Sequence, residues 1–401
     1  MNVLFLTLLG FNTIYESGLY QDLLREFVKK GHQVYAISPV EKREKQYTHL
    51  FAEENVKILR LQIGNTQKTN ILEKGISTIQ IEPAFKKAVK TYFLDVKFDL
   101  VLYSTPPITL TAAVKYVKKR DEAKTYLLLK DIFPQNAVDI GLLSKNRLRG
   151  LLYNYFRKQE KKLYAVSDRI GCMSPANVKY ILEHNPEVNP VKVEVCPNSI
   201  EVIDKSVDDV SRKKIRIKYG IPLDKAVFVY GGNLGKPQGI PFLIECLRKC
   251  REIENVFFLI VGDGTEYHLI EEFVGKDKPE NVRLMRRLSK EDYDTMVGAC
   301  DVGMLFLDHR FTIPNFPSRM LSYMQAKLPI LAVTDPNTDI GRIIMQGEFG
   351  WWCESNNSDT FLSIVKECLD NTSNCGNNAY QYLLKHYDVY KTYDIITARW
   401  N

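Results

Sequence analysis

One stretch just past the middle of the chain, Val227–Ile244, restricts the fold most. An apolar run, Val227–Tyr230, ends at two glycines, and a polar, glycine-rich turn follows through Gly239 before a helical apolar pattern begins at Ile240. A strand, a glycine turn and a helix in this order present a helix N-terminus and bare backbone N–H groups to an anion, usually a phosphate. The mid-chain position of this unit predicts a second nucleotide-binding fold after a first one.

Short apolar runs alternate with helical patterns on both sides of that unit. This rhythm is typical of parallel sheets with helices on both faces. We therefore expect an α/β protein with two doubly wound, Rossmann-like domains, residues 1–200 and 201–401, that face a central cleft. The polar segment 206–214 is the expected linker, and the last helix may pack back onto the first domain. Strands are expected at 3–7, 33–37, 98–103, 125–129, 169–173, 226–230, 256–261, 282–285, 302–307 and 329–333.

Length and composition exclude several classes of protein. With 401 residues, of which 45% are hydrophobic and 26% charged, the chain has the size and composition of two ordinary soluble domains. No stretch reaches the roughly 20 apolar residues that span a bilayer, and the N-terminus lacks the basic residues of a signal peptide. The eight cysteines form no CxxC pair, which favours reduced core residues over a metal site. We expect a cytoplasmic protein without a metal.

Charge is distributed unevenly along the chain. Residues 1–200 contain 30 Lys and Arg against 20 Asp and Glu, whereas residues 201–401 contain 25 against 28. The excess in the first half is either ordinary scatter or a surface for an anionic partner such as a membrane. The segment 145–164 combines leucine, tyrosine and phenylalanine with seven Lys or Arg. That pattern is typical of a helix at a membrane interface and equally of a core-packed helix with a solvated face.

Candidate binding residues in the second half follow predicted strands. Because ligands bind outside the carboxyl ends of parallel strands, these residues are expected to gather at one edge of the sheet. Two adjacent arginines can pair with a diphosphate, and Ser318 is a candidate N-cap of a helix whose N-terminus attracts phosphate. The four segments are the turn Gly232–Gly239, then Gly262-Asp263, Arg286-Arg287 and Pro314–Met320. Together they predict a site for a nucleoside diphosphate.

In the first half, Asp131 directly follows a predicted strand and precedes a turn. A carboxylate at this position can accept a hydrogen bond from a substrate hydroxyl, although aspartate also caps such turns. We favour the functional interpretation. The loops 10–18 and 104–107 also follow strands and should face the same cleft. The six histidines show no arrangement typical of nucleophilic catalysis, and His309 is more simply a surface residue.

These residues together resemble the family-four glycosyltransferases of the GT-B fold, and above all the bacterial branch that builds O-antigen, capsule and exopolysaccharide units. The likeness covers essentially the whole chain. The segments that carry it are Asp131-Ile132-Phe133-Pro134-Gln135, Met173-Ser174, Pro197-Asn198-Ser199, Gly232-Asn233-Leu234-Gly235 with Gln238-Gly239, Val261-Gly262-Asp263-Gly264 and Phe316-Pro317-Ser318-Arg319-Met320-Leu321.

The resemblance implies an enzyme that transfers a hexosyl or N-acetylhexosaminyl group with retention of anomeric configuration. The donor would be a nucleotide sugar, most simply UDP-linked, and the acceptor a saccharide linked to polyprenyl diphosphate. The enzyme would work at the anionic inner face of the cytoplasmic membrane, without nucleic acid, and cationic side chains rather than a metal or cofactor would stabilise the leaving diphosphate.

The same resemblance implies roles for individual residues. The catalytic residues would be Asp131, Lys236 and Arg319. The donor would contact Gly232, Asn233, Gln238, Gly262, Asp263, Arg286, Arg287, Ser318, Met320 and Ser322, and the acceptor Glu16, Ser17, Gly18, Pro106 and Gln135.

The chain departs from the family pattern at several of these positions. Asn233 and Gln238 replace an Arg and a Lys that hold the diphosphate in many members, so Lys236 and the nearby arginines are the expected substitutes. Pro314 and Ser322 replace a pair of Glu residues, which leaves ribose recognition to Ser322 or to Asp335 or Asp339. Gln135 replaces an acidic residue.

Two other functions are compatible with these residues. A UDP-sugar 2-epimerase shares the two-domain fold but needs acid and base residues beside the donor, and the chain has few histidines for that task. A non-catalytic nucleotide-sugar-binding subunit would explain the missing basic and acidic pairs. Turnover that depends on an acceptor distinguishes the transferase from both.

Overall fold

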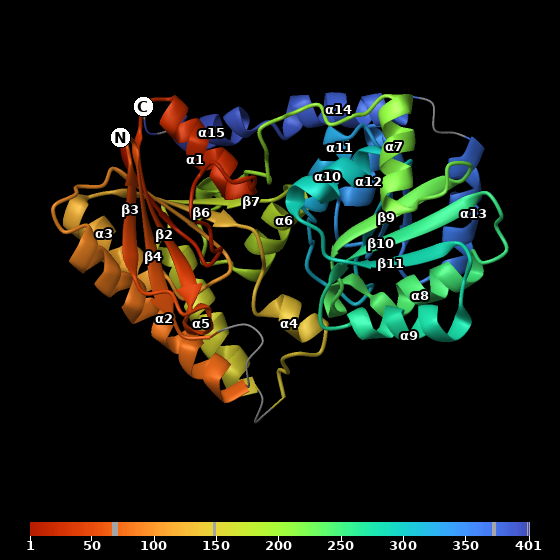
Figure 1. Ribbon diagram of the computed structural model, residues 1–401. Coiled ribbons are helices and arrows are strands. Elements are labelled where there is room, and N and C mark those ends of the chain that lie inside the picture. Colours follow the sequence, from red (N-terminus) through yellow and green to blue (C-terminus); the bar gives the residue numbers. More distant parts are fainter. Residues whose placement is uncertain (66–70, 147–149, 371–373, 399, 401) are drawn as a thin grey trace. The chain divides into compact units, whose positions relative to one another are not determined.

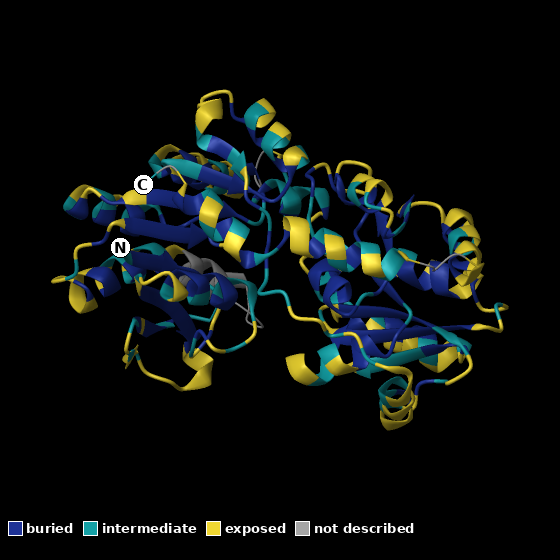
Figure 2. Cartoon of the chain, turned by 90° about the horizontal axis from the view of Figure 1, so that it is seen from above, coloured by how far each residue is buried: buried dark blue, intermediate teal, exposed yellow. Residues whose placement is uncertain are grey.

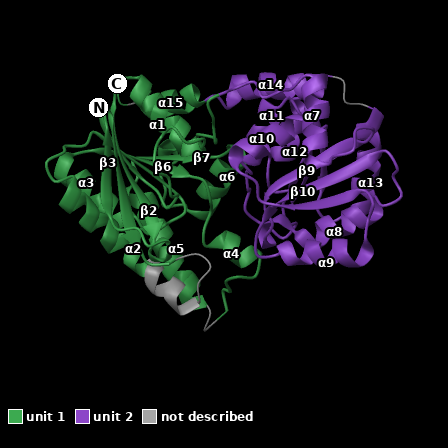
Figure 3. Cartoon of the chain, viewed as in Figure 1, with its two compact units in different colours: residues 1–201, 389–401 green, residues 202–388 purple. Residues whose placement is uncertain are grey.

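The computed structural model describes residues 1–65, 71–146, 150–370, 374–398 and 400. The chain divides into two compact units (Figure 3). Unit 1 comprises Met1–Glu201 and Val389–Asn401, and unit 2 comprises Val202–Asp388. The expected linker 206–214 is wrong, because most of it forms helix α7 (Asp209–Tyr219), whose N-cap Asp208 accepts the Ser211 N–H at 2.7 Å.

Unit 1 is built on a sheet in the order β3-β4-β2-β1-β5-β6-β7-β8. All neighbouring strands are parallel except the edge strand β3, which runs antiparallel to β4. Figure 1 shows α2 and α3 against one face of this sheet and α1 with α15 against the other. The strands are β1 Asn2–Leu6, β2 Gln33–Glu41, β3 His49–Glu53, β4 Val56–Ile63, β5 Leu100–Ser104, β6 Lys124–Leu129, β7 Arg169–Cys172 and β8 Val193–Val195. The helices are α1 Leu19–Lys29, α2 Ile71–Tyr92, α3 Thr111–Asp121, α4 Gln135–Asp139, α5 Gly150–Val166, α6 Pro175–His184 and α15 Val389–Thr397.

The core of unit 1 includes the last helix of the chain. Phe27 of α1 packs edge-on against Tyr393 of α15, with ring centroids 4.9 Å apart. Ile396 is fully buried in the cluster that α1 forms on β1, β2 and β4. The helix α15 therefore completes a hydrophobic layer that the first half of the chain leaves open.

Unit 2 has six parallel strands in the order β11-β10-β9-β12-β13-β14, which is the strand order of a Rossmann sheet. Phe228, Phe258 and Phe361 lie in a large cluster between this sheet and helices α8, α9 and α13. Figure 2 shows the strands of both sheets largely in the colour of buried residues. The strands are β9 Ala226–Asn233, β10 Val256–Asp263, β11 Val282–Arg286, β12 Val302–Phe306, β13 Ile330–Thr334 and β14 Gly350–Glu354. The helices besides α7 are α8 Ile240–Lys249, α9 Tyr267–Asp277, α10 Lys290–Gly298, α11 Arg319–Gln325, α12 Ile340–Gln346, α13 Ser358–Asp370 and α14 Cys375–His386.

The expected α/β architecture with two parallel, doubly wound sheets is confirmed. Every expected strand is present, and four were missed: β3, β4, β8 and β14. Among the described residues, no helix is both long and apolar enough to cross a membrane.

Candidate active site

The glycine turn of unit 2 lies at the point where the strand order of its sheet reverses. The turn follows β9, which has β10 on one side and β12 on the other. A ligand binds at such a switch point in open α/β sheets. Gly232 has a φ of +122°, which disfavours other residues. A Cβ on Gly262 of β10 would lie 1.9 Å from the Gly232 carbonyl oxygen. The two glycines therefore let the two strand ends approach closely and leave backbone exposed at the turn.

The side chains of Asn233 and Gln238 bind each other across this turn. The Asn233 amide donates to Gln238 Oε1 at 2.7 Å, and the Gly235 N–H donates to the same oxygen at 3.3 Å. These are the positions at which the resembling family often carries an Arg and a Lys. Here the two residues brace the turn, so its positive charge must come from elsewhere.

Arg319, the first residue of α11, provides a cation beside the turn. Its guanidinium lies 4.4 Å from the centre of the Tyr230 ring, and a Cβ on Gly232 would lie 3.0 Å from its Nη2. The Nη1 atom is buried and has no hydrogen-bond partner in the described part of the chain, and Tyr293 Oη is in the same state. No described carboxylate forms an ion pair with Arg319. A half-buried cation whose Nη1 is cut off from water and lacks a partner is costly unless an anion binds to it.

A hollow of about 470 Å³ lies next to the turn in unit 2. Asp308, just after β12, is held by two side-chain hydrogen bonds of 2.8 Å from Arg310. Burial alone would raise the pKa of Asp308, but the bonds from Arg310 lower it below its ordinary value. Two buried oxygens here, Glu266 Oε2 and Ser355 Oγ, lack hydrogen-bond partners among the described residues. The lining residues are Lys236, Gly239, Pro241, Phe242, Glu266, Leu307, Asp308, His309, Arg310 and Ser355.

Sequence reasoning missed Glu266, Asp308, Arg310 and Ser355. The segment Leu307–Arg310 directly follows the expected strand 302–307, so the rule that led to the other candidates also applied to it. Lys236 was a candidate and is exposed at the rim of this hollow, together with His309.

The arginine pair after β11 is only partly available to a ligand. Arg286 stacks 3.6 Å from the centre of the Tyr267 ring and pairs with Asp263 at 3.7 Å and with Glu271 at 3.2 Å. The structure thus brings the candidates Asp263 and Arg286 together, but as partners of each other. Arg287 is exposed.

One expectation for the helix after Pro314 is wrong, and the other candidates of unit 2 differ in how accessible their side chains are. Ser318 occupies the N-cap position of α11, but its side chain makes no capping hydrogen bond. Met320 is fully buried, so its side chain is not available to a ligand. Asp335 is also fully buried, and its Oδ1 accepts the Asn337 and Thr338 N–H groups. Asp339 is 6% exposed. Ser322 is half-buried and is the more accessible of the three ribose candidates.

In unit 1, Asp131 follows β6 and is fixed by two neighbours. The Asn136 amide donates to both carboxylate oxygens, at 2.7 and 2.8 Å, and the Asp131 N–H donates to Thr105 Oγ1 at 3.1 Å. Burial raises the pKa of Asp131 to about 6, against the lowering effect of the bonds from Asn136. A carboxylate with a pKa raised towards neutrality and no cationic partner is typical of a catalytic acid or base.

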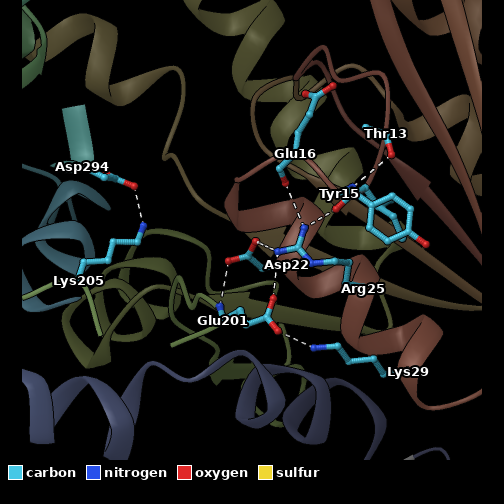
Figure 4. Close-up of polar contacts among 10 residues, drawn as sticks. Thr13, Tyr15, Glu16, Asp22, Arg25, Lys29, Glu201, Lys205 and Asp294 are labelled. Carbon is cyan, nitrogen blue, oxygen red and sulfur yellow. Dashed lines mark hydrogen bonds and ion pairs between the residues drawn. The ribbon is translucent and has the colours of Figure 1, made fainter. Parts of the chain in front are cut away.

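The loop between β1 and α1 holds the candidates Glu16, Ser17 and Gly18. Arg25 donates from Nη1 to the carbonyl oxygens of Ile14 and Glu16, and its Nη2 contacts Asp22 and Glu201 (Figure 4). The Glu16 carboxylate accepts the Asn12 N–H at 3.1 Å. Glu16 therefore shapes this loop from within, while Ser17 is exposed.

The two remaining acceptor candidates lie elsewhere on unit 1. Pro106 is exposed just after β5. Gln135 begins α4 and donates to Asp139 at 2.6 Å. It also lines a hollow of about 250 Å³ with Tyr153, Arg157 and Tyr180 among its other residues. Within the described part of the chain, no three His, Cys, Asp or Glu side chains gather as a metal site.

Comparison with known proteins agrees with this geometry. Residues 211–382 match the family model described as glycosyl transferases group 1. The chain is 27% identical over 333 residues to the probable glycosyltransferase WbjE of Pseudomonas aeruginosa, covering 81% of this chain and 79% of the relative. The chain is also similar to the putative colanic acid biosynthesis glycosyl transferase WcaI of Escherichia coli K12. The two are 23% identical over 208 residues, which cover 52% of this chain and 49% of the relative. Among solved structures, Anabaena HepE in complex with UDP and glucose superimposes with a TM-score of 0.70 at 16% identity, covering 99% of this chain and 98% of that one.

The fold and these relatives together define the class of protein. Residues 211–382, nearly all of unit 2, match the glycosyl transferases group 1, the chain is similar over 81% of its length to a probable glycosyltransferase, and its fold is the GT-B fold.

Proposed function

We propose that this protein transfers a sugar from a UDP-linked donor to a saccharide acceptor carried on polyprenyl diphosphate, with retention of configuration, in the synthesis of a bacterial surface polysaccharide. The names of WbjE and WcaI and the UDP found in HepE support this choice. The transferred group would be a hexosyl or N-acetylhexosaminyl unit, and the product a building block of the O-antigen or capsule type.

The observation that carries the proposal is Arg319. A buried Nη1 without a partner, beside an exposed glycine backbone at the switch point of the sheet, is suited to the diphosphate of the donor. The charge that develops on the leaving UDP would be stabilised by this guanidinium and by Lys236, without a requirement for a metal or cofactor. Hydroxyl groups of the donor sugar and ribose would donate hydrogen bonds in the adjacent hollow, where Glu266 and Ser355 have unpartnered oxygens.

Asp131 would act on the acceptor. Above pH 6 its carboxylate is mostly ionised and accepts a hydrogen bond from the attacking hydroxyl. Asn136 fixes its orientation by holding both oxygens.

The helix α5 would provide contact with the membrane. Its residues Leu151, Leu152 and Tyr155 are exposed, and so are Lys158 and the adjacent pair 161–162. Exposed apolar side chains flanked by lysines are typical of helices that lie in an anionic interface. Residues 147–149 of the expected interfacial segment lie outside the described residues. The protein would thus work on the inner face of the cytoplasmic membrane without crossing it.

Thermal unfolding in the presence of nucleotides tests the proposal, because a ligand that binds only the folded state raises the midpoint. We expect UDP or one UDP-sugar to raise it equally with and without EDTA. The same preparation, given the UDP-sugar and a polyprenyl-diphosphate saccharide, should form product only when acceptor is present. Epimerised donor without acceptor would point to the epimerase instead, and binding without any turnover to a non-catalytic subunit.

A further inference from the structure

The free edge of the unit 1 sheet carries a pocket that no residue assigned above explains. The edge strand β3 pairs with β4 in the register His49 with Arg60 and Phe51 with Ile58. Residues at alternate positions of a strand share a face, and directly opposed residues of an antiparallel pair lie on the same side. His49, Phe51 and Glu53 therefore continue the face on which Ile58 is buried in the core. The edge strand β3 extends this face beyond the buried core, and Phe51 is 42% exposed there.

The pocket forms between this face and the loop that precedes α1. Its volume is about 420 Å³, which is large enough for a sugar ring. One wall is the side chain of Phe51, and across from the strand the loop contributes Tyr15, which is 68% exposed. The lining residues are Asn12, Thr13, Tyr15, His49, Phe51, Glu53 and Arg60. Two aromatic rings and several hydrogen-bonding groups thus surround one space.

Arg60 supplies a buried charge to this pocket. It is 5% exposed, and its Nη1 donates to the Phe11 carbonyl oxygen at 2.9 Å and to Ser38 Oγ at 2.7 Å. Its Nε is buried without a hydrogen-bond partner among the described residues, and no described carboxylate forms an ion pair with it. A guanidinium held in this way has donor capacity left for an oxygen of a ligand.

The loop wall is fixed before any ligand arrives. Arg25 donates to the carbonyl oxygens on either side of Tyr15, those of Ile14 and Glu16. The Tyr15 N–H donates to Thr13 Oγ1 at 3.2 Å. Figure 4 shows that these contacts use the backbone at Tyr15 and leave its ring outside the network. A rigid wall reduces the ordering cost of binding.

We propose that this pocket binds a pyranose ring of the acceptor saccharide, and this inference rests on the function proposed above. A pyranose has apolar C–H faces, which suit Tyr15 and Phe51, and a rim of hydroxyl groups, which suit Asn12, Glu53 and Arg60. Such a combination of aromatic walls and a few polar groups is usual in small-molecule sites.

The position of the pocket in the sheet shows which ring it would hold. Between β6, which precedes Asp131, and β3 lie the strands β5, β1, β2 and β4. At about 4.8 Å per strand, the pocket lies roughly 20 Å from the strand that carries the candidate base. It would therefore hold a ring several units away from the hydroxyl that reacts, and so the acceptor would be an oligosaccharide rather than a single sugar.

Saturation-transfer NMR on the full chain tests this without relying on turnover. The probes are millimolar methyl α-D-glucopyranoside, methyl α-D-galactopyranoside, methyl N-acetyl-β-D-glucosaminide and methyl β-D-glucuronoside. We expect signal transfer to at least one of them, reduced about fivefold or more by Phe51→Ala and by Tyr15→Ala. Leu50→Ala is the matched control, because Leu50 adjoins Phe51, is 40% exposed and lies on the opposite face of the strand. It should leave the signal unchanged.

Two results would contradict the proposal that this pocket binds a pyranose ring. They are the absence of signal transfer to any of the glycosides, and an equal signal in the native chain and in Phe51→Ala. The UDP-induced thermal shift of each variant is measured in parallel. If that shift is intact while glycoside binding is absent, the subsite is wrong and the transferase proposal stands. If glycoside binding is intact while no nucleotide shifts the midpoint, the proposed donor site fails instead.

Discussion

The candidate sites of the two units each contain a poorly solvated charge without a counter-ion among the described residues, Asp131 in unit 1 and Arg319 in unit 2, and the two charges respond differently to burial. Asp131 in unit 1 accepts hydrogen bonds from the Asn136 amide nitrogen at both carboxylate oxygens, and burial raises its pKa to about 6. Arg319 in unit 2 lies against Tyr230 and keeps an unpartnered nitrogen.

The difference follows from the chemistry of the two groups. A carboxyl group can lose its charge by taking up a proton, whereas a guanidinium does not lose its proton in proteins. In the absence of substrate, Asp131 can therefore become neutral by taking up a proton from solvent. A catalytic base must also be able to exchange a proton. The free-energy cost of desolvating the Arg319 guanidinium can be offset only by a bound anion. The comparison implies that unit 1 responds to pH and unit 2 to nucleotide.

The largest effect is expected from Asp131→Asn. We expect transfer to fall by about 10²- to 10⁴-fold, because the side chain no longer accepts the proton of the attacking hydroxyl. UDP binding should be unchanged, since the residue lies in the other unit. Initial rates and calorimetry on the same preparation check both. Transfer at the native rate would remove Asp131 from the mechanism.

Arg319→Gln should come next. Loss of a charge-assisted hydrogen bond to the diphosphate should weaken UDP binding by about 10- to 100-fold. Calorimetric titration measures this, with Arg248→Gln as the control, because that arginine is exposed, pairs with Asp277 and lies at the opposite end of α8 from the turn. Equal affinity in the two variants would contradict the role of Arg319.

The pH dependence of the rate should follow Asp131. Activity should rise as pH passes through about 6, where the carboxylate ionises. In Asn136→Ala the midpoint should move higher, because the hydrogen bonds that favour the charged form are removed. Rate profiles between pH 5 and 8 measure both, and an unshifted midpoint would assign the titration to another group.

The free energy of unfolding should also depend on the ionisation of Asp131. It should decrease as pH rises through about 6, whereas activity should increase. The pKa of Asp131 in the folded chain lies above the ordinary value, so the folded state binds the proton more tightly than the unfolded state between about pH 4 and 6. The contribution of Asp131 is fully present below pH 4 and is lost as pH rises through 6. Relative to the native chain, Asp131→Asn should therefore gain stability above pH 6. Urea unfolding at pH 5 and pH 7.5 compares the two.

The smallest effect is expected from Lys236→Ala. This lysine is exposed at the rim of the hollow, so solvent and salt screen its attraction to the diphosphate. We expect UDP binding to weaken by about two- to fivefold at low salt and the difference to shrink at 0.5 M salt. A loss as large as that of Arg319→Gln would show that the exposed cation carries the binding instead.

The sequence was sufficient to predict the features that depend on local order. Parallel strands, the glycine turn after β9 and Asp131 after β6 all follow from apolar runs and the residues that end them. The strand β3 was missed because its residues 49–53 are largely exposed and lack a clear alternation. The strand β4 was missed although apolar residues recur along it. The strand β8 is only three residues long.

Other features of the site depend on contacts that no sequence pattern reveals. Asn233 and Gln238 were expected to face the donor, but the geometry of the turn pairs their amides. Among the described residues, Arg319 has no counter-charge, because Tyr230 of β9, Tyr293 of α10 and Tyr323 of its own helix α11 surround it. Because Tyr230 and Tyr293 are far from Arg319 in the sequence, no local sequence pattern indicates this environment.

The place of α15 in unit 1 has a consequence for biosynthesis. Unit 2 is continuous in the chain, whereas the layer over Phe27 and His32 is completed only by Tyr393, whose hydroxyl lies 2.8 Å from His32 Nε2. On the ribosome, the surface around Phe27 and His32 is therefore made well before the helix that covers it, and it stays uncovered until α15 has been synthesised. A nascent chain of this protein has a built-in interval during which chaperones can recognise unit 1.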